Sequence, residues 1–169
     1  MQHSSGYFLK AGLIALVVAL IADQAAKFWL FSIVDIGARG AIRIGPFLDL
    51  VLTWNKGISY GWFQTETASG EIILLAVKVV AVIGLAIWLI RAQSRLAAIG
   101  VGLIIGGAIG NAIDRLAYGA VMDFALFHLK FGGKDHDWYV FNLADVAIVA
   151  GVAALLYDSF VGTTAAKAP

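Results

Sequence analysis

The chain has 169 residues, 61% of them apolar and 14% charged, whereas ordinary soluble domains have about 45–50% apolar and about 25% charged residues. A soluble fold of this size cannot bury so much apolar surface, and a disordered chain would be richer in charge. The formal net charge of +1 gives no basic tract for nucleic acid, and the lack of cysteine excludes disulfides and thiol catalysis. The sequence therefore predicts a single integral membrane domain, residues 1–169.

Four stretches approach the roughly 20 apolar residues that a membrane-spanning helix needs. In chain order, the predicted spans are residues 11–31, 72–90, 96–113 and 138–157. The first resembles a signal peptide because Lys10 precedes it, but apolar residues resume after Lys27 and no small-residue cleavage pattern stands out. We therefore interpret it as a retained helix. Four spans give an all-α membrane fold with both termini on the same side.

Two longer connections, about residues 35–70 and 118–137, lie on the other side of the predicted bundle. The alternating runs 42–44 and 49–54 predict short strands in the first connection, with a turn at Gly45-Pro46. The second joins an apolar stretch, 124–131, to a polar insert, 132–137, whose conformation the sequence leaves open. Lys and Arg are denser in the tails and the short turn at 91–95, which predicts cytoplasmic termini.

Aspartates interrupt or follow the apolar spans, where an ionisable residue costs at least about 2.5–3.5 kcal/mol and is a candidate for function. Counted at about 1.5 Å per residue, three of them lie roughly 20–28 Å from the inner ends of their spans, and a fourth follows the third span directly. These acids are Asp23, Asp114, Asp145 and Asp123. We expect all four at one level, in the outer part of the membrane.

Polar partners recur three or four residues from these acids, a spacing that places side chains on one helix face. They are Lys27 for Asp23, Asn111 and Arg115 around Asp114, and Asn142 for Asp145. The Asp23–Lys27 pair alone is equally explained as an anchor of a helix end, whereas convergence of the whole set favours a functional site. Glycines at 102, 106 and 110 predict close packing of the third span against its neighbours.

Several chemistries are excluded by missing motifs. The chain has no H-E-x-x-H or G-x-S-x-G, no Lys-Ser/Thr after its glycines, and its histidines lie outside the spans. We interpret residues 135–137 as a solvated loop and not as a metal site. Carboxylate chemistry remains, with two aspartates that share a proton and activate water. A proton-coupled transporter or channel subunit and a structural scaffold stay open as alternatives, although a relay would stagger its acids through the membrane.

Five motifs, in order along the chain, resemble those of prolipoprotein signal peptidase, the bacterial type II signal peptidase. They are D-Q-A-A-K at 23–27, N-K-G-I-S-Y at 55–60, G-G-A-I-G-N-A-I-D-R at 106–115, V-M-D-F at 121–124 and F-N-L-A-D at 141–145. The departure from the family pattern is small, since Tyr60 stands where phenylalanine is usual. The motifs are distributed over four predicted spans that cover nearly the whole chain.

The resemblance implies a four-helix aspartic protease of the bacterial inner membrane, with a small extracytoplasmic β-like cradle and its active site near the outer face. The catalytic positions fall on Asp123 and Asp145. The supporting or substrate-binding positions are Asp23, Lys27, Asn55, Gly57, Asn111, Asp114, Arg115 and Asn142. The implied substrates are diacylglyceryl-modified prolipoproteins, cut on the amino side of the lipidated cysteine. Membrane lipid and globomycin-type cyclic peptides are the other implied partners, no cofactor or metal is required, and we expect a monomer.

Overall fold

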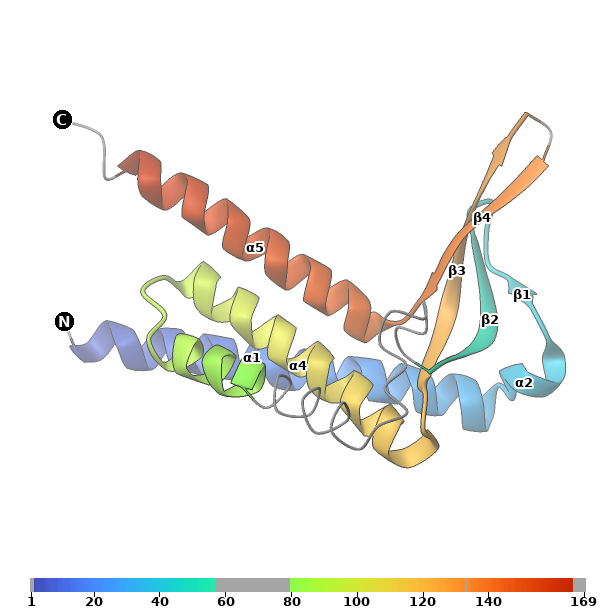
Figure 1. Cartoon of the computed structure of the whole chain (residues 1–169), viewed down its shortest axis with the longest axis horizontal. Helices are drawn as coiled ribbons and strands as arrows, with labels where there is room; N and C mark the ends of the chain where they lie inside the picture. The colour runs from blue at the N-terminus through green and yellow to red at the C-terminus, as the bar shows by residue number, and fades with distance from the viewer. Residues whose placement is uncertain (1, 57–79, 133, 166–169) are drawn as a thin grey trace, which may run out of the picture.

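The computed structural model describes residues 2–56, 80–132 and 134–165 (Figure 1). Three of the described helices are long and apolar enough to cross a membrane: α1 (Gln2–Phe28), α4 (Arg95–Tyr118) and α5 (Leu143–Ala165). The π-helix η1 (Trp29–Ile33) extends α1, so the apolar stretch runs over Tyr7–Ile33. These helices cover the predicted spans 11–31 and 96–113 and most of the fourth.

The second predicted span, 72–90, is only partly among the described residues. Its second half is the helix Val80–Ile90, which packs Leu85 and Leu89 into an apolar core with Ala98 and Val101 of α4. A crossing by the complete segment, and hence the count of four spans, stays a prediction.

The fourth predicted span, 138–157, begins too early. Residues 138–141 end the strand β4 (Lys134–Phe141), and α5 starts at Leu143. The run is apolar on both sides of this boundary, so hydropathy does not separate strand from helix. The boundary is set by Asn142, whose Oδ1 accepts from Asp145 N at 3.0 Å while Asn142 N donates to Asp145 Oδ2 at 3.2 Å. Such reciprocal capping fixes the start of a helix.

The strands form one antiparallel sheet in the order β1 (Ile42–Arg43), β2 (Leu48–Asn55), β3 (Val121–Phe131) and β4. The first two strands match the predicted alternation. The predicted loop 118–137 is instead largely the strands β3 and β4, and residues 134–137 of the polar insert form the start of β4. Alternation gave no signal there because most of β3 is buried on both faces.

The strand register brings two polar residues together. Asp123 of β3 pairs with Thr53 of β2, and Asn55 lies two residues further along β2 on the same face as Thr53. A diagonal neighbour of this kind is within reach of a polar side chain. The sheet therefore places Asn55 beside Asp123.

Helix α4 lies between α1 and α5, and its glycines allow this close packing. A Cβ added at Gly102 would collide with the carbonyl oxygen of Gly12 on α1, and one at Gly107 would collide with the carbonyl oxygen of Ala144 on α5. Bulky side chains at these positions would push the helices apart. The prediction that the glycines serve helix packing is confirmed.

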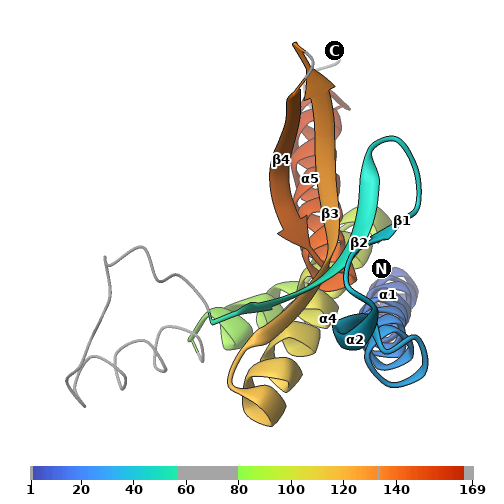
Figure 2. The same cartoon turned by 90° about the vertical axis from the view of Figure 1, so that its right-hand side faces the viewer.

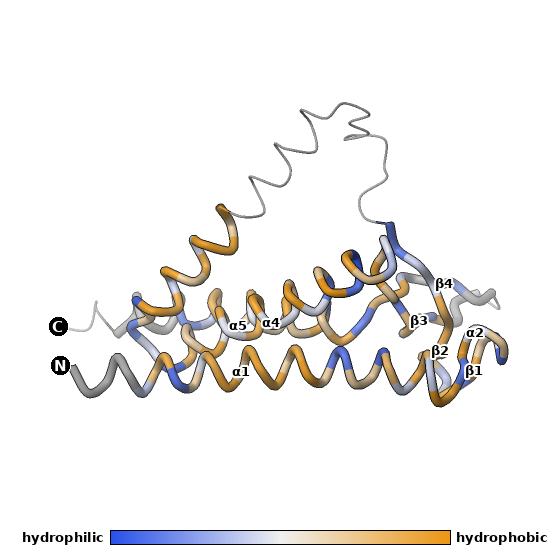
Figure 3. The backbone as a smooth tube through the Cα atoms, turned by 90° about the horizontal axis from the view of Figure 1, so that it is seen from below, coloured by the Kyte–Doolittle hydropathy of each residue, from blue (hydrophilic) through white to orange (hydrophobic). Residues whose placement is uncertain are grey.

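The C-terminal ends of α1 and α4 and the N-terminal end of α5 lie together at the sheet (Figure 1). Helix α1 begins and α5 ends at the opposite end of the bundle (Figure 1). Viewed from the sheet end, β2 and β3 cross close to the helix ends, and the β3–β4 hairpin extends away from them (Figure 2). The helix surfaces are apolar along most of their length (Figure 3), with Val17 and Val18 of α1 and Val149 and Phe160 of α5 exposed. Such large apolar faces suit lipid and not water.

Candidate active site

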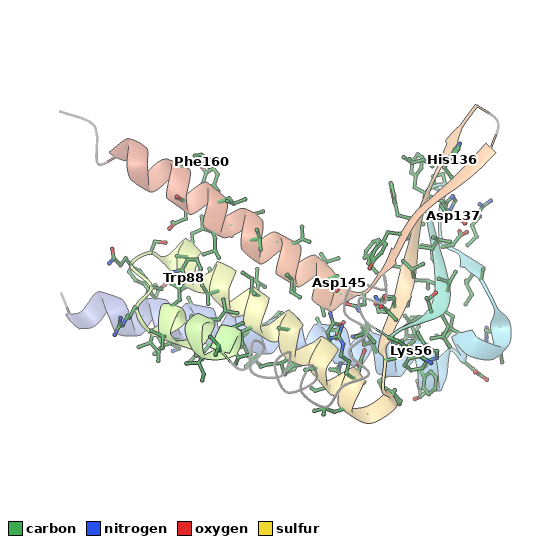
Figure 4. All side chains as sticks on the ribbon, viewed as in Figure 1. Lys56, Trp88, His136, Asp137, Asp145 and Phe160 are labelled. Carbon is green, nitrogen blue, oxygen red and sulfur yellow. The ribbon has the colours of Figure 1, made fainter. Side chains whose placement is uncertain are left out.

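Polar side chains converge where the end of α1, the end of α4 and the start of α5 meet β2 and β3. Those that are buried there are Asp23, Lys27, Asn111, Asp114, Asp123 and Asn142. Asp145 lies beside them in the first turn of α5, at the base of the sheet (Figure 4). The predicted convergence of acids from different segments is therefore present in the structure.

Lys27 lies between two aspartates, and we call these three residues the ion cluster. Its Nζ is 2.8 Å from Asp23 Oδ2 and 2.7 Å from Asp114 Oδ2, and all three side chains are at most 6% exposed. Asp23 Oδ1 also accepts from Ala144 N at 2.9 Å, at the start of α5, and Asp114 Oδ2 accepts from Met122 N at 3.0 Å. The ion cluster therefore ties α1, α4, α5 and β3 together.

Two further residues complete the ion cluster. Gln24 Nε2 donates to Asp114 Oδ1 at 3.1 Å and to the Gly110 carbonyl at 3.2 Å, which links α1 to α4. A Cβ added at Gly110 would lie 2.6 Å from Asp23 Oδ2, so this glycine makes room for the carboxylate. Gln24 is absent from the predicted site. The sequence feature that could have identified Gln24 as a site residue is its position inside an apolar span, next to Asp23.

The remaining two acids, Asp123 and Asp145, form what we call the aspartate pair. Asp123 accepts from Asn142 Nδ2 at 2.6 Å and from Asn55 Nδ2 at 3.0 Å. Asp145 accepts from Asn111 Nδ2 at 3.0 Å and from the backbone N–H of Asn142. These donors are all neutral amides. They hold the two carboxyl groups in place without supplying a positive charge.

Asn111 and Asn142 join the aspartate pair to the ion cluster. Asn142 Nδ2 donates to Asn111 Oδ1 at 3.0 Å as well as to Asp123. The same Asn111 oxygen accepts from Lys27 Nζ at 3.3 Å, while the Asn111 amide nitrogen donates to Asp145. Each amide is thus oriented by a donor on one side and an acceptor on the other. The result is a single hydrogen-bond network across five chain segments.

The environment of Asp123 favours a retained proton. Burial is the largest influence and raises the pKa of its carboxyl group, the hydrogen bond from Asn55 opposes this, and the negative charge of Asp145 raises the pKa further. A carboxyl group with a raised pKa beside a second carboxyl group can supply a general acid and a general base in one place. This arrangement suits hydrolysis.

Two predicted site residues fall outside this network. Arg115 is exposed, and its Nη1 donates to the backbone carbonyl of Asn111 at 3.2 Å, one turn back on α4. Within the described residues, the cation paired with Asp114 is Lys27, so the expected local pairing with Arg115 is replaced by one between helices. Gly57 lies outside the described residues.

A pocket of about 130 Å³ opens beside the ion cluster, between α1, β2 and α4. Lys27 and Asp114 lie at its polar side, and Phe31, Trp54 and Tyr118 line its apolar side. The rings contact one another, with centroid distances of 6.0 Å for Phe31–Trp54 and 5.2 Å for Trp54–Tyr118. The pocket can therefore accept a group with both polar and apolar parts.

Residues suited to a metal ion do not gather at this site. Across residues 2–56, 80–132 and 134–165, no group of three His, Cys, Asp or Glu side chains is placed to hold a metal. His136 and Asp137 lie toward the tip of the β3–β4 hairpin, away from Asp145 (Figure 4).

Fold and site together define a membrane protein with a buried network of carboxyl groups and amides at the sheet end of its helices. The family model described as "Signal peptidase (SPase) II" matches residues 14–161. The chain belongs to the signal peptidase II family, whose members are proteases of lipoprotein processing.

Individual relatives agree with this assignment. The chain is 69% identical to the lipoprotein signal peptidase of Nitrobacter hamburgensis, over 95% of this chain and 98% of that protein. It is 60% identical to the lipoprotein signal peptidase of Rhodopseudomonas palustris over the same shares. A solved structure described as a bacterial membrane enzyme, at 2.3 Å resolution, has the same fold, with a TM-score of 0.71, 24% identity and coverage of 93% of this chain and 91% of that one.

Proposed function

We propose that the protein removes the signal peptide from diacylglyceryl-modified prolipoproteins by hydrolysing the peptide bond on the amino side of the lipidated cysteine. Family membership supports the substrate class. The observation that carries the chemistry is the aspartate pair, in which two carboxyl groups from separate elements, Asp123 and Asp145, are held by neutral amides. Amide donors fix the geometry of a carboxyl group and leave it free to change protonation state.

In the proposed reaction, Asp145 is the base and Asp123 the acid. Asp145, which is partly exposed, takes a proton from water as the water oxygen bonds to the scissile carbonyl carbon. Asp123, which is 2% exposed, donates its proton to the carbonyl oxygen. When the tetrahedral intermediate collapses, Asp123 takes back a proton from one hydroxyl group as the C=O bond re-forms, the C–N bond breaks, and the leaving nitrogen takes the proton held by Asp145. Each carboxyl group thus serves once as donor and once as acceptor.

The position of the site suits such a substrate. A lipidated signal peptide is itself a membrane helix, so its scissile bond lies at the membrane surface, and its acyl chains can remain in lipid during the reaction. We place both termini in the cytoplasm and the aspartate pair near the outer face of the bacterial inner membrane. The acids of the network all lie at the sheet end of the bundle, unlike the staggered acids of a proton relay.

Cysteine labelling tests this orientation. The chain contains no cysteine, so a single cysteine placed at Lys56, which is exposed near the sheet, or at Arg91, at the opposite end, has no background. An impermeant thiol reagent should label the Lys56→Cys variant in intact cells and the Arg91→Cys variant only after permeabilisation. The reverse pattern would invert the topology and place the site at the cytoplasmic face.

Cleavage by the purified protein in vesicles tests the activity. A diacylglyceryl prolipoprotein should be cut so that the lipidated cysteine becomes the new N-terminus by mass spectrometry, and the same precursor without lipid should remain intact. A globomycin-type cyclic peptide should block the reaction. The active-site variant is Asp145→Asn, and its matched control is Asp158→Asn, at the far end of α5, where Ser94 Oγ donates to the carboxylate at 2.7 Å. Failure of the folded wild type to cleave, or equal cleavage by Asp145→Asn, would refute the proposal.

A further inference from the structure

A second cavity lies at the other end of the bundle, between α1 and α4. It is a groove of about 490 Å³, and two basic residues from different helices, Lys10 and Arg95, line it. The guanidinium carbon of Arg95 lies 5.6 Å from the ring centroid of Tyr7, which also lines the groove, so a cation–π contact holds Arg95 at this end. None of the ion pairs among the described residues includes Lys10 or Arg95. The groove therefore has a positive mouth, and no carboxylate of the described part of the chain forms an ion pair with it.

Beyond this mouth the groove is apolar. Its remaining lining residues are Ala11, Ile14, Ala15 and Val18 of α1 and Ile99 and Leu103 of α4. The helices touch at Gly12 and Gly102 on the adjacent face, while the small side chains of Ala11 and Ala15 leave space beside this contact. The groove thus follows directly from the way the two helices pack.

The length of the groove matches one leaflet of a membrane. Eight residues separate Lys10 from Val18 and Arg95 from Leu103, a rise of about 12 Å along each helix. The hydrocarbon core of a bilayer is about 30 Å thick. An apolar groove of this length, with its cations at the membrane surface, has the dimensions of an acyl chain beneath its headgroup.

We propose that this groove binds one anionic glycerophospholipid, with the headgroup phosphate between Lys10 and Arg95 and one acyl chain along Ala15 and Leu103. Basic pockets between transmembrane helices are suited to anionic headgroups. In the orientation proposed above, the lipid belongs to the inner leaflet and is distinct from the substrate at the aspartate pair. Because it contacts both α1 and α4, the bound lipid stabilises their packing.

Native mass spectrometry of the full chain in detergent tests the proposal, with phosphatidylglycerol and phosphatidylcholine of identical acyl chains as probes. The wild type should retain phosphatidylglycerol more strongly. The double variant Lys10→Gln/Arg95→Gln should weaken this retention roughly 30-fold, from the attraction that each basic residue adds toward an anionic lipid, and should leave phosphatidylcholine unchanged. The matched control Arg91→Gln removes a cation that lines a different cavity, beside Asp158, and should retain phosphatidylglycerol like the wild type.

Further outcomes test the acyl chain and exclude a folding defect. Ala15→Phe fills the groove and should also weaken phosphatidylglycerol retention, whereas soluble glycerol 3-phosphate should not displace the lipid at comparable concentration. Both substituted cations are exposed, so the double variant should keep the wild-type circular dichroism. Equal retention of the two lipids by the wild type, undiminished phosphatidylglycerol binding by the double variant, or displacement by glycerol 3-phosphate would each overturn the proposal.

Discussion

The ion cluster and the aspartate pair lie in the same network, and the acids of both are aspartates, yet their surroundings differ. Asp23 and Asp114 share the ammonium group of Lys27, at 2.8 and 2.7 Å. Asp123 and Asp145 accept from amides. A buried carboxylate beside a cation ties the surrounding elements together through the ion pair, whereas the hydrogen bonds to the aspartate pair come from neutral amides. The position of Lys27 therefore separates the two acids that we assign to structure from the two that we propose for catalysis.

Substitutions in the aspartate pair should have the largest effect, and this effect should be a loss of activity. Asparagine is nearly isosteric with aspartate but can be neither the acid nor the base of the proposed reaction. Asp123→Asn and Asp145→Asn should each lower cleavage of a lipidated precursor by about 10²–10⁴-fold or more, with little change in detergent unfolding. The double variant should be no less active than either single one, because the two residues act as a unit. Appreciable turnover by either variant would rule out the aspartate mechanism.

The ion cluster should show the largest effect on stability. Lys27→Met leaves Asp23 and Asp114 buried without their cation, and removing one partner of a buried ion pair typically costs about 3–5 kcal/mol. The free energy of unfolding in detergent should fall by about this amount. The matched control Lys56→Met, at an exposed position, should change it by no more than about 0.5 kcal/mol. Similar losses in the two variants would remove the distinction between the two groups of acids.

Asp114→Asn should have a smaller effect. The amide keeps the size of the side chain and one acceptor oxygen but loses a charge-assisted contact with Lys27, a loss of about 1.5–3 kcal/mol. We expect reduced stability in detergent and partial loss of turnover. A variant with wild-type stability and no activity would move Asp114 into the catalytic set and redraw the aspartate pair.

The smallest expected effect is a shift in the pH profile. Asn55 stabilises the ionised form of Asp123 and so lowers the pKa of its carboxyl group. Without this donor, the proton is retained to higher pH, and the alkaline limb of activity, which reports loss of the shared proton, should move upward in Asn55→Ala. Thr53→Ala, two residues away on β2, should leave the limb in place. A downward shift in Asn55→Ala would contradict the assignment of Asp123 as the acid.

Much of the architecture could be predicted from the sequence because the signals are local. The apolar content identified a membrane protein, and continuous hydropathy located α1 and α4. Alternation predicted β1 and β2, and the four-residue glycine spacing predicted the packing of α4. The depth of each acid within its span predicted their convergence, since a helix advances by a fixed rise per residue.

Other features depend on contacts between distant segments, and only the tertiary structure decided them. The hairpin β3–β4 has no alternation because β3 is largely buried on both faces, and α5 begins at Leu143, directly after the capping residue Asn142, inside a continuous apolar run. Lys27, predicted as the partner of Asp23, also neutralises Asp114 on another helix. Local spacing assigned that role to Arg115, because sequence distance measures neighbours on one helix and not across two. The separation of the four acids into the ion cluster and the aspartate pair arises from the packing of α1 against α4, which places the buried ammonium group of Lys27 beside two of them.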